Sequence, residues 1–285
     1  MTEQAHGQIG TPPVPVCPRH PDRVSYVRCQ RCARPACPEC QRPAAVGIQC
    51  VDCVNEAQAR VPVTRTALGG RARGGRPVVT ITLIALCVVA YLAQRVPGLT
   101  VTGNFIFMPA LGPYEPYRFL TSAFLHGGTL HLALNMYALW IVGSVLEPAL
   151  GRWRFTALYL LSAVGGSVAV LLLANPADPS WSTSVVGASG AVFGLFAAIF
   201  IVMRKFGRDA TQILILIALN FVLGFVFAGI SWQSHLGGAI TGALLALAYA
   251  YAPRIRRTLV GVFATAGVAA LLVVMAVARY APLLG

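Results

Sequence analysis

The chain has 285 residues, of which 56% are hydrophobic and only 11% are charged. That share of charged residues is too small to cover the surface of a soluble globular protein, so an ordinary soluble domain is excluded. Apolar runs of about twenty residues recur instead, the length that a helix needs to cross the hydrocarbon core of a bilayer. The composition therefore predicts an all-α membrane protein.

The formal net charge of +13 permits either nucleic-acid binding or a topological role in a membrane. Arginines crowd the residues just before the first apolar run and several short connections between later runs. Basic residues beside membrane helices are the usual topogenic signal, and they also attract anionic lipid headgroups. We therefore expect contact with the lipid bilayer and no nucleic-acid partner.

The chain divides by composition into five parts. The divisions are a disordered tail at 1–16, a Cys-rich module at 17–56, an Arg/Gly linker at 57–77, a core of six transmembrane helices at 78–252, and a seventh transmembrane helix at 258–279. The linker holds two Gly-Gly pairs, Gly69-Gly70 and Gly74-Gly75, and we expect it to be flexible.

Seven of the eight cysteines lie in the Cys-rich module, in regularly spaced pairs. No apolar segment typical of a secretory signal peptide precedes them, so we expect a reducing cytoplasm, where such cysteines bind metal more readily than they form a disulfide scaffold. The pattern resembles B-box-type or treble-clef-like cross-brace fingers, and it predicts structural zinc, one or two ions, since protein ligands fill every position. Interleaved pairing, first with third and second with fourth, is our preferred arrangement. The expected ligands are Cys17, His20, Cys29, Cys32, Cys37, Cys40, Cys50 and Cys53.

Apolar runs separated by proline or polar clusters predict the membrane helices in chain order. The segment 98–128 is too long for a tight connection and partly apolar, so we expect a loop that lies partly in the membrane interface. The expected spans are 78–96, 129–147, 153–174, 187–203, 211–230, 235–252 and 258–279.

Lysine and arginine alternate between the connections on the two sides of these spans. The residues before the first span and the connections after spans two, four and six are basic, whereas the other connections carry almost no basic residue. The positive-inside rule then predicts an integral protein of the plasma or inner membrane, with a cytoplasmic N-terminus and an external C-terminus.

Several polar residues lie inside the apolar spans, where they are costly and usually face the bundle interior. His131 and Asn135 are four residues apart, so one helix face offers two hydrogen-bond donors to a single point, as an oxyanion requires. The alternative is that both form interhelical hydrogen bonds.

Ser189 and His235 lie near the ends of two other spans, at the same predicted depth. Gly187 and Gly190 flank the serine and open space around its hydroxyl, although many membrane serines only bond to their own helix. His235 precedes Gly238 and Gly242, a small-residue face that permits close helix packing, although a packing histidine is the alternative. No carboxylate lies in the outer halves of these spans, so the residues permit a Ser/His dyad with Ser189 as nucleophile and His235 as general base.

At these residues the chain resembles the rhomboid family of intramembrane serine proteases, over about 78–252. The resemblance implies a catalytic Ser189/His235 dyad without a cofactor, an oxyanion hole from His131, Asn135 and the Ser189 amide, and single-span or polytopic membrane proteins as substrates. It further implies structural roles for the remaining motif residues, which are Arg118, His126, Glu147, Gly187, Gly190, Phe193, Gly238 and Gly242. Two positions depart from the family pattern: Tyr117 stands where relatives usually have Trp, and Phe193 stands where many have Tyr.

Two other classes of function are compatible with a polytopic chain. A catalytically silent adaptor could bind membrane helices and present the zinc module to a cytoplasmic protein partner, but it would not need Ser189 and His235. A transporter predicts ionisable residues at the midplane and inverted repeats, and the sequence offers neither. The sequence therefore favours a serine endopeptidase.

Overall fold

The computed structural model describes residues 13–60, 66–70, 76–226 and 229–284. The chain forms two compact units, residues 1–63 and residues 64–285, and each is described by itself. Part of the predicted tail (1–12) and of the predicted linker (61–65 and 71–75, with Gly74 and Gly75) lies outside the described residues.

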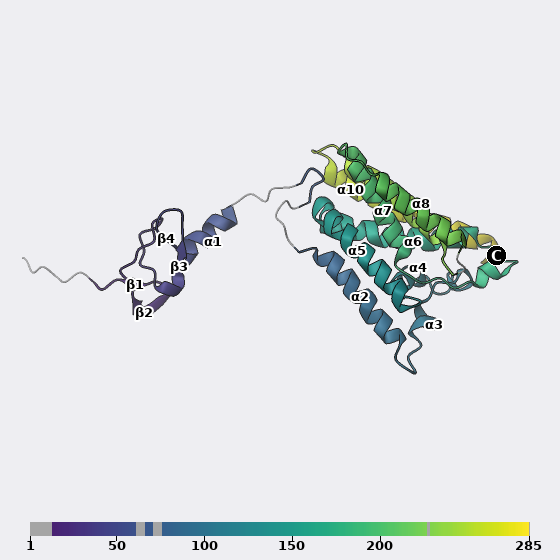
Figure 1. Cartoon of the computed structure of the whole chain (residues 1–285), viewed down its shortest axis with the longest axis horizontal. Coiled ribbons are helices and arrows are strands. Elements are labelled where there is room, and N and C mark those ends of the chain that lie inside the picture. Colours follow the sequence, from purple (N-terminus) through teal and green to yellow (C-terminus); the bar gives the residue numbers. More distant parts are fainter. Residues whose placement is uncertain (1–12, 61–65, 71–75, 227–228, 285) are drawn as a thin grey trace, which may run out of the picture. The chain divides into compact units, whose positions relative to one another are not determined.

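The first unit consists of two small antiparallel hairpins, a 3-10 turn and one helix (Figure 1). Its buried residues are almost all cysteines, so in the part of this unit that the structure describes no conventional apolar core holds it together. The helix continues to Arg60, beyond the expected end of the module at residue 56. The elements are β1 (Val16–Cys17), β2 (His20–Val24), η1 (Pro38–Cys40), β3 (Gln41–Pro43), β4 (Ile48–Cys50) and α1 (Val51–Arg60).

The second unit is helical, as the composition predicts, and seven helices in its described residues match the expected spans closely. The fourth begins at the serine itself, and the second runs through Pro148 to Leu150. These helices are α2 (Val78–Gln94), α5 (Thr129–Leu150), α6 (Arg152–Leu173), α7 (Ser189–Lys205), α8 (Thr211–Val226), α9 (Trp232–Tyr251) and α10 (Arg257–Leu284).

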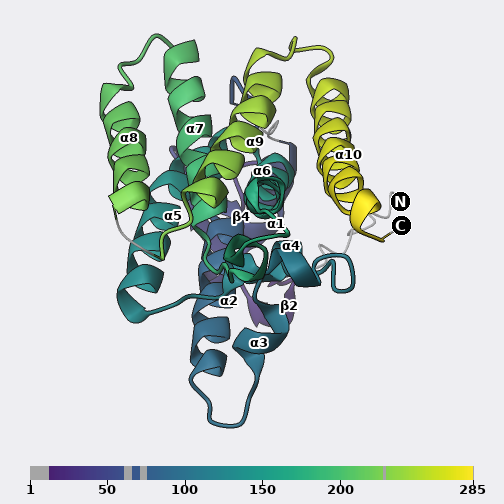
Figure 2. The same cartoon turned by 90° about the vertical axis from the view of Figure 1, so that its right-hand side faces the viewer.

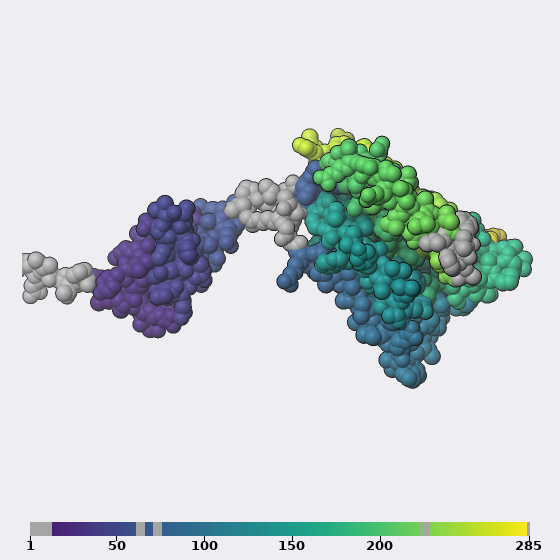
Figure 3. Space-filling model, in the orientation of Figure 1, coloured from purple at the N-terminus to yellow at the C-terminus, as the bar shows by residue number. Residues whose placement is uncertain are grey.

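Several of these helices have a length and an apolar character that suit a membrane. Among the described residues, Thr129–Leu150, Arg152–Leu173 and Arg257–Leu283 are long and apolar enough to cross one, and Val78–Gln94 and Thr211–Val222 are shorter apolar helices. The face of this unit in Figure 3 is formed largely by α2, α5 and α8. Large apolar side chains such as Leu134, Ile141 and Leu219 are exposed on α5 and α8. Exposed residues of this kind are expected where lipid replaces water.

Helix α6 lies at the centre of the bundle, with α7, α9 and α10 packed against it (Figure 2). Glycines at the contacts allow this close packing. A Cβ at Gly165 would meet the Thr241 side chain, and a Cβ at Gly166 would lie 2.6 Å from the Ser234 hydroxyl oxygen. In contrast, α8 packs less extensively, mainly against α7 and α9 in the described part of the chain.

The connection 98–128 is folded rather than irregular. Arg118, which is 4% exposed, donates hydrogen bonds to the carbonyls of Gly103 and Ile106 and pairs with Glu115. These bonds satisfy backbone groups that would otherwise be unpaired, which explains how a loop can lie against the bundle. Its elements are α3 (Val101–Phe105), η2 (Pro109–Leu111), α4 (Arg118–Thr121) and η3 (Ser122–Phe124), and η4 (Pro179–Ser182) lies in the connection before α7.

The linker is not free along its whole length. The Thr66 hydroxyl and the Gly70 amide both donate to the Ala149 carbonyl at the end of α5, at 2.7 and 3.1 Å. Leu68 is buried, and its carbonyl accepts from Arg154. Gly70 thus lies against the end of α5, where this turn supplies hydrogen-bond donors for a carbonyl that has no partner within the helix.

Candidate active site and zinc centres

Ser189 is the first residue of α7, and Gly187, two residues before it, has a positive φ. Gly187 has a φ of +128°, a region that side chains disfavour, and its amide donates to the Ser122 carbonyl at 3.0 Å. A Cβ at Gly187 would lie 2.7 Å from His131 Cε1 and 3.7 Å from the Ser189 hydroxyl oxygen. The glycine thus allows the backbone before Ser189 to lie directly against the His131 imidazole.

The His131 ring has its Nε2 edge toward this turn. Its Nδ1 accepts a hydrogen bond from the Gly127 amide at 3.4 Å, so in the neutral ring Nε2 carries the proton. Nε2 would lie 2.9 Å from a Cβ at Gly187. His131 can therefore present an N–H donor beside the serine.

Asn135 is buried one turn further along α5. Its amide nitrogen donates to the His131 carbonyl at 2.9 Å, which leaves the second amide hydrogen for another acceptor. The two alternatives for Asn135, oxyanion donor and packing residue, both remain compatible with this geometry.

His235 lies at the end of the first turn of α9 and is 6% exposed. Phe193, one turn after Ser189, stacks on the imidazole with ring centroids 4.0 Å apart and planes 9° apart, and Phe221 adds an edge contact. Nδ1 of His235 is buried and has no hydrogen-bond partner among the described residues. Aromatic packing rather than a carboxylate thus fixes the imidazole plane. Phe221 carries no motif, so sequence reasoning did not find it.

Glycines bring α7 and α9 into backbone contact at this level. A Cβ at Gly238 would overlap the Gly190 carbonyl, and a Cβ at Gly242 would overlap the Gly194 carbonyl. The Ser234 hydroxyl oxygen would lie 2.8 Å from a Cβ at Gly190. These contacts set the first turns of the helices that carry Ser189 and His235 side by side.

The other motif residues lie around this centre. His126 is buried, with its ring 5.3 Å from that of His131. Glu147 is buried at the far end of α5 and accepts from the amides of Val79 and Thr80 and from the Thr80 hydroxyl. Arg118 supports the 98–128 loop, so Glu147 and Arg118 brace the start of α2 and the loop respectively.

The eight residues expected to bind zinc gather into two separate clusters, and within each cluster the candidate ligand atoms lie within 4.8 Å of one another. The pairing is interleaved: the first pair joins the third, and the second joins the fourth. This is the interleaved cross-brace arrangement that we preferred on the sequence. One cluster contains Cys17, His20, Cys37 and Cys40, and the other contains Cys29, Cys32, Cys50 and Cys53.

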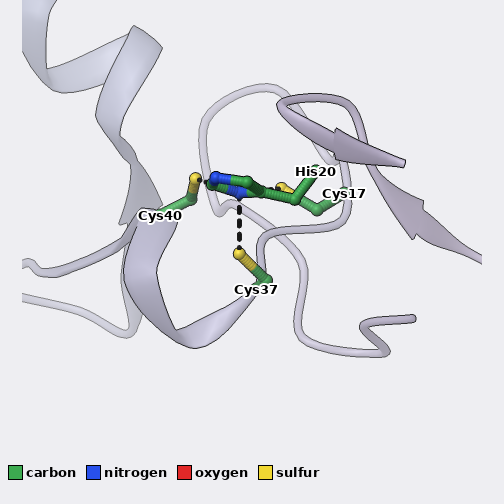
Figure 4. A group of neighbouring side chains, drawn as sticks. All are labelled: Cys17, His20, Cys37 and Cys40. Carbon is green, nitrogen blue, oxygen red and sulfur yellow. Dashed lines mark hydrogen bonds between the residues drawn. The ribbon is translucent and has the colours of Figure 1, made fainter. Parts of the chain in front are cut away.

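The first cluster fits a tetrahedral zinc ion (Figure 4). His20 Nδ1 lies 3.2, 3.4 and 4.0 Å from the sulfurs of Cys37, Cys40 and Cys17. Zinc bonds of about 2.3 Å to sulfur and 2.0 Å to nitrogen separate tetrahedral ligands by about 3.5 Å. A hydrogen bond involving the Cys37 backbone is the main cause that lowers the pKa of the Cys17 thiol to about 6.

Nε2 of His20, the ring nitrogen that does not face the cysteine sulfurs, has a charged neighbour. Glu39 lies 3.9 Å from His20 Nε2, and Arg23 pairs with the same carboxylate at 2.6 Å. A carboxylate behind a zinc-binding histidine fixes the ring and strengthens its donor nitrogen.

The second cluster is an all-cysteine site. Cys32 and Cys50 have their sulfurs 3.8 Å apart, the separation of about 3.8 Å expected for two sulfurs on one tetrahedral zinc. The Arg34 guanidinium donates to the Cys32 sulfur at 3.3 Å and stabilises its thiolate form. The donor set and its geometry therefore fit structural zinc in both clusters.

Comparisons with known proteins agree with the motif pattern. Residues 113–252 match the Rhomboid domain family model. Rhomboid protease GluP of Bacillus subtilis is 33% identical over 187 residues, 62% of this chain and 36% of that protein. Rhomboid protease AarA of Providencia stuartii is 28% identical, over 63% of this chain and 75% of that protein.

A further relative is matched over most of its length. YdcA of Bacillus subtilis is 32% identical over 181 residues, which cover 59% of this chain and 86% of YdcA. The chain spans only about a third of GluP, in contrast. The helical bundle, the motif residues and these matches together make the chain a member of the rhomboid family.

Proposed function

We propose that the chain is an intramembrane serine endopeptidase that cleaves transmembrane segments of membrane proteins. Ser189 is the nucleophile and His235 the general base. The main support for the proposal is the stacking of Phe193 on His235. Phe193 lies one turn after Ser189, the first residue of α7, so the stack places His235 beside the start of the helix that carries the serine. The names of GluP and AarA as rhomboid proteases support the same reaction.

In this mechanism, the Ser189 oxygen attacks the carbonyl carbon of the scissile peptide bond while His235 takes the hydroxyl proton. His235 then returns that proton to the leaving amine, and the acyl group stays on the serine. A water molecule, deprotonated by the same imidazole, hydrolyses the ester and restores the free enzyme. Because Nδ1 of His235 has no partner in the described chain, His235 works with Ser189 as a dyad.

The tetrahedral intermediates carry a negative charge on the former carbonyl oxygen. We assign its stabilisation to the His131 Nε2–H, the free amide hydrogen of Asn135 and the Ser189 backbone amide. The start of α7 adds the positive end of a helix dipole at the same point.

The substrate class and the orientation belong to this proposal. Single-span or polytopic membrane proteins would enter from the bilayer, and the basic connections support a cytoplasmic N-terminus and an external C-terminus. The active site then lies near the outer surface, and the zinc module lies on the other side of the membrane.

The zinc module has a regulatory or partner-binding role in this scheme. Its zinc ions are structural, since four protein ligands surround each position and leave no coordination site for a reacting water. Deletion of residues 1–60 should leave basal cleavage, because Thr66 and Gly70, which bond to α5, are retained. Complete loss of cleavage in a correctly inserted deletion protein would contradict this role.

The proposed activity can be tested by co-expression with a library of tagged single-span proteins. Wild type should yield shortened products that Ser189→Ala does not. Ser144→Ala is the matched control, because Ser144 lies on α5 and only bonds to the carbonyl of its own helix. Identical product patterns for wild type and Ser189→Ala would overturn the proposal.

A further inference from the structure

Two side chains in the last turns of α10 form hydrogen bonds with two loops, the loop 98–128 and the connection before α7. The Tyr280 hydroxyl donates to the Pro109 carbonyl in the 98–128 loop at 2.7 Å. Arg279 donates to the Ala174 carbonyl, where the connection to α7 begins, at 2.8 Å. The seventh helix therefore bonds directly to both connections.

These two bonds lie in a packed cluster. Tyr280 is 6% exposed, and Trp181 of η4 lies 6.0 Å from its ring, edge to face. The Arg279 guanidinium lies 5.5 Å above the same indole. A Cβ at Gly112 would overlap the Tyr280 hydroxyl, so the loop approaches this side chain as closely as its backbone allows.

The 98–128 loop in turn forms hydrogen bonds with the residues just before Ser189. Phe107 and Val185 exchange two backbone hydrogen bonds, at 2.8 and 3.2 Å. The Gly187 amide donates to the Ser122 carbonyl at 3.0 Å. A continuous series of contacts thus runs from Tyr280 through the loop to the backbone just before Ser189.

We propose that Tyr280, with Arg279, is a positioning residue for the nucleophile. It acts through the 98–128 loop and the Phe107–Val185 bridge to set the position of the Ser189 hydroxyl. This inference rests on the proposed peptidase function and assigns the seventh helix a role in it. Small displacements of a nucleophile cost large factors in rate, so a brace outside the site can govern turnover.

Tyr280→Phe separates positioning from overall stability. It keeps the buried ring and its contact with Trp181, and it removes only the bond to Pro109. We expect kcat to fall roughly 3- to 10-fold, the rate equivalent of one net hydrogen bond, with little change in KM. The thermal midpoint should fall by only about a few degrees, because one hydrogen bond is lost while the apolar packing of the ring is retained.

Gly112→Ala tests the same contact from the loop side. Gly112 has helical backbone angles, which alanine adopts easily, so the substitution acts through its new methyl group. That methyl meets the Tyr280 hydroxyl first, and the next atom, Cζ, is at 3.0 Å. Gly112→Ala should therefore lower kcat in the wild-type background and lower it by a smaller factor in Tyr280→Phe. Gly103→Ala is the matched control in the same loop, since a Cβ there meets nothing within 4 Å.

The experiment measures kcat, KM and thermal midpoints for these full-length variants in proteoliposomes with one transmembrane substrate, alongside Ser189→Ala. A lowered kcat in Tyr280→Phe and a non-additive double variant would support the inference. A wild-type kcat in Tyr280→Phe, or fully additive effects, would overturn it while Ser189-dependent cleavage persists. Cleavage that survives in Ser189→Ala would instead overturn the proposed function, and the inference with it.

Discussion

Phe193 lies flat against His235, with the ring centroids 4.0 Å apart and the ring planes inclined by 9°. Phe193 belongs to the helix that begins at Ser189, so this stack fixes the imidazole relative to the serine. It also takes the place of the carboxylate that orients the histidine in a catalytic triad.

The stack predicts different results for two substitutions of Phe193. Phe193→Tyr should retain activity, because the aromatic face is kept. Phe193→Ala should lower kcat by roughly 2- to 12-fold, the rate equivalent of an aromatic contact worth about 0.5–1.5 kcal/mol. Steady-state kinetics on a purified transmembrane substrate would check both. Equal activity of the alanine and tyrosine variants would show that the stack does not orient the base.

Asn135→Ala should reduce kcat by roughly 10- to 1000-fold, the range for loss of one oxyanion donor. KM should change little, because the donor matters mainly in the transition state. Since the Asn135 amide also bonds to the His131 carbonyl, thermal unfolding must be measured alongside the kinetics. A normal kcat with weakened substrate binding would assign Asn135 to helix packing.

Metal analysis of the purified full chain should find two zinc ions. His20→Ala and Cys29→Ala should each remove one ion, because the two residues belong to different clusters. Cys87→Ala is the control and should keep both, since Cys87 is buried in the membrane unit. Chelation should unfold the module, which has no apolar core of its own. A single ion in wild type would show that half of the ligand set is wrong.

Glu147→Ala should destabilise the membrane unit, by about 2–6 kcal/mol if both backbone amides are left unpaired at about 1–3 kcal/mol each. The Val79 and Thr80 amides both donate to this buried carboxylate. Thermal unfolding in detergent would measure the loss. An unchanged midpoint in Glu147→Ala would mean that other groups satisfy the start of α2.

Much of this architecture could be predicted because it depends on local patterns. Apolar periodicity locates the helices, and the i, i+4 spacing places His131 and Asn135 on one face of α5. The regular Cys pairs predict the set of expected ligands, but their spacing does not determine which pairs come together, and the structure supplies the interleaved arrangement. The small-residue spacing after His235 predicts close packing, which is observed against Gly190 and Gly194.

The remaining features depend on single residues far apart in the chain, without a repeating pattern. Nothing in the sequence around Tyr280 indicates a bond to Pro109, 171 residues away. The Gly69-Gly70 pair looks like flexible linker, yet Gly70 bonds to Ala149 at the end of α5. Such contacts follow from the three-dimensional packing of elements, and composition alone does not encode them.

The central claim is that Ser189 is a nucleophile activated by His235. The most direct test is labelling of the purified full-length protein with a fluorophosphonate, followed by peptide mass analysis. Wild type should be labelled at Ser189, and neither His235→Ala nor Ser189→Ala should be labelled, although both should remain folded. Labelling of His235→Ala at the wild-type rate, or labelling of wild type at a different residue, would contradict the dyad.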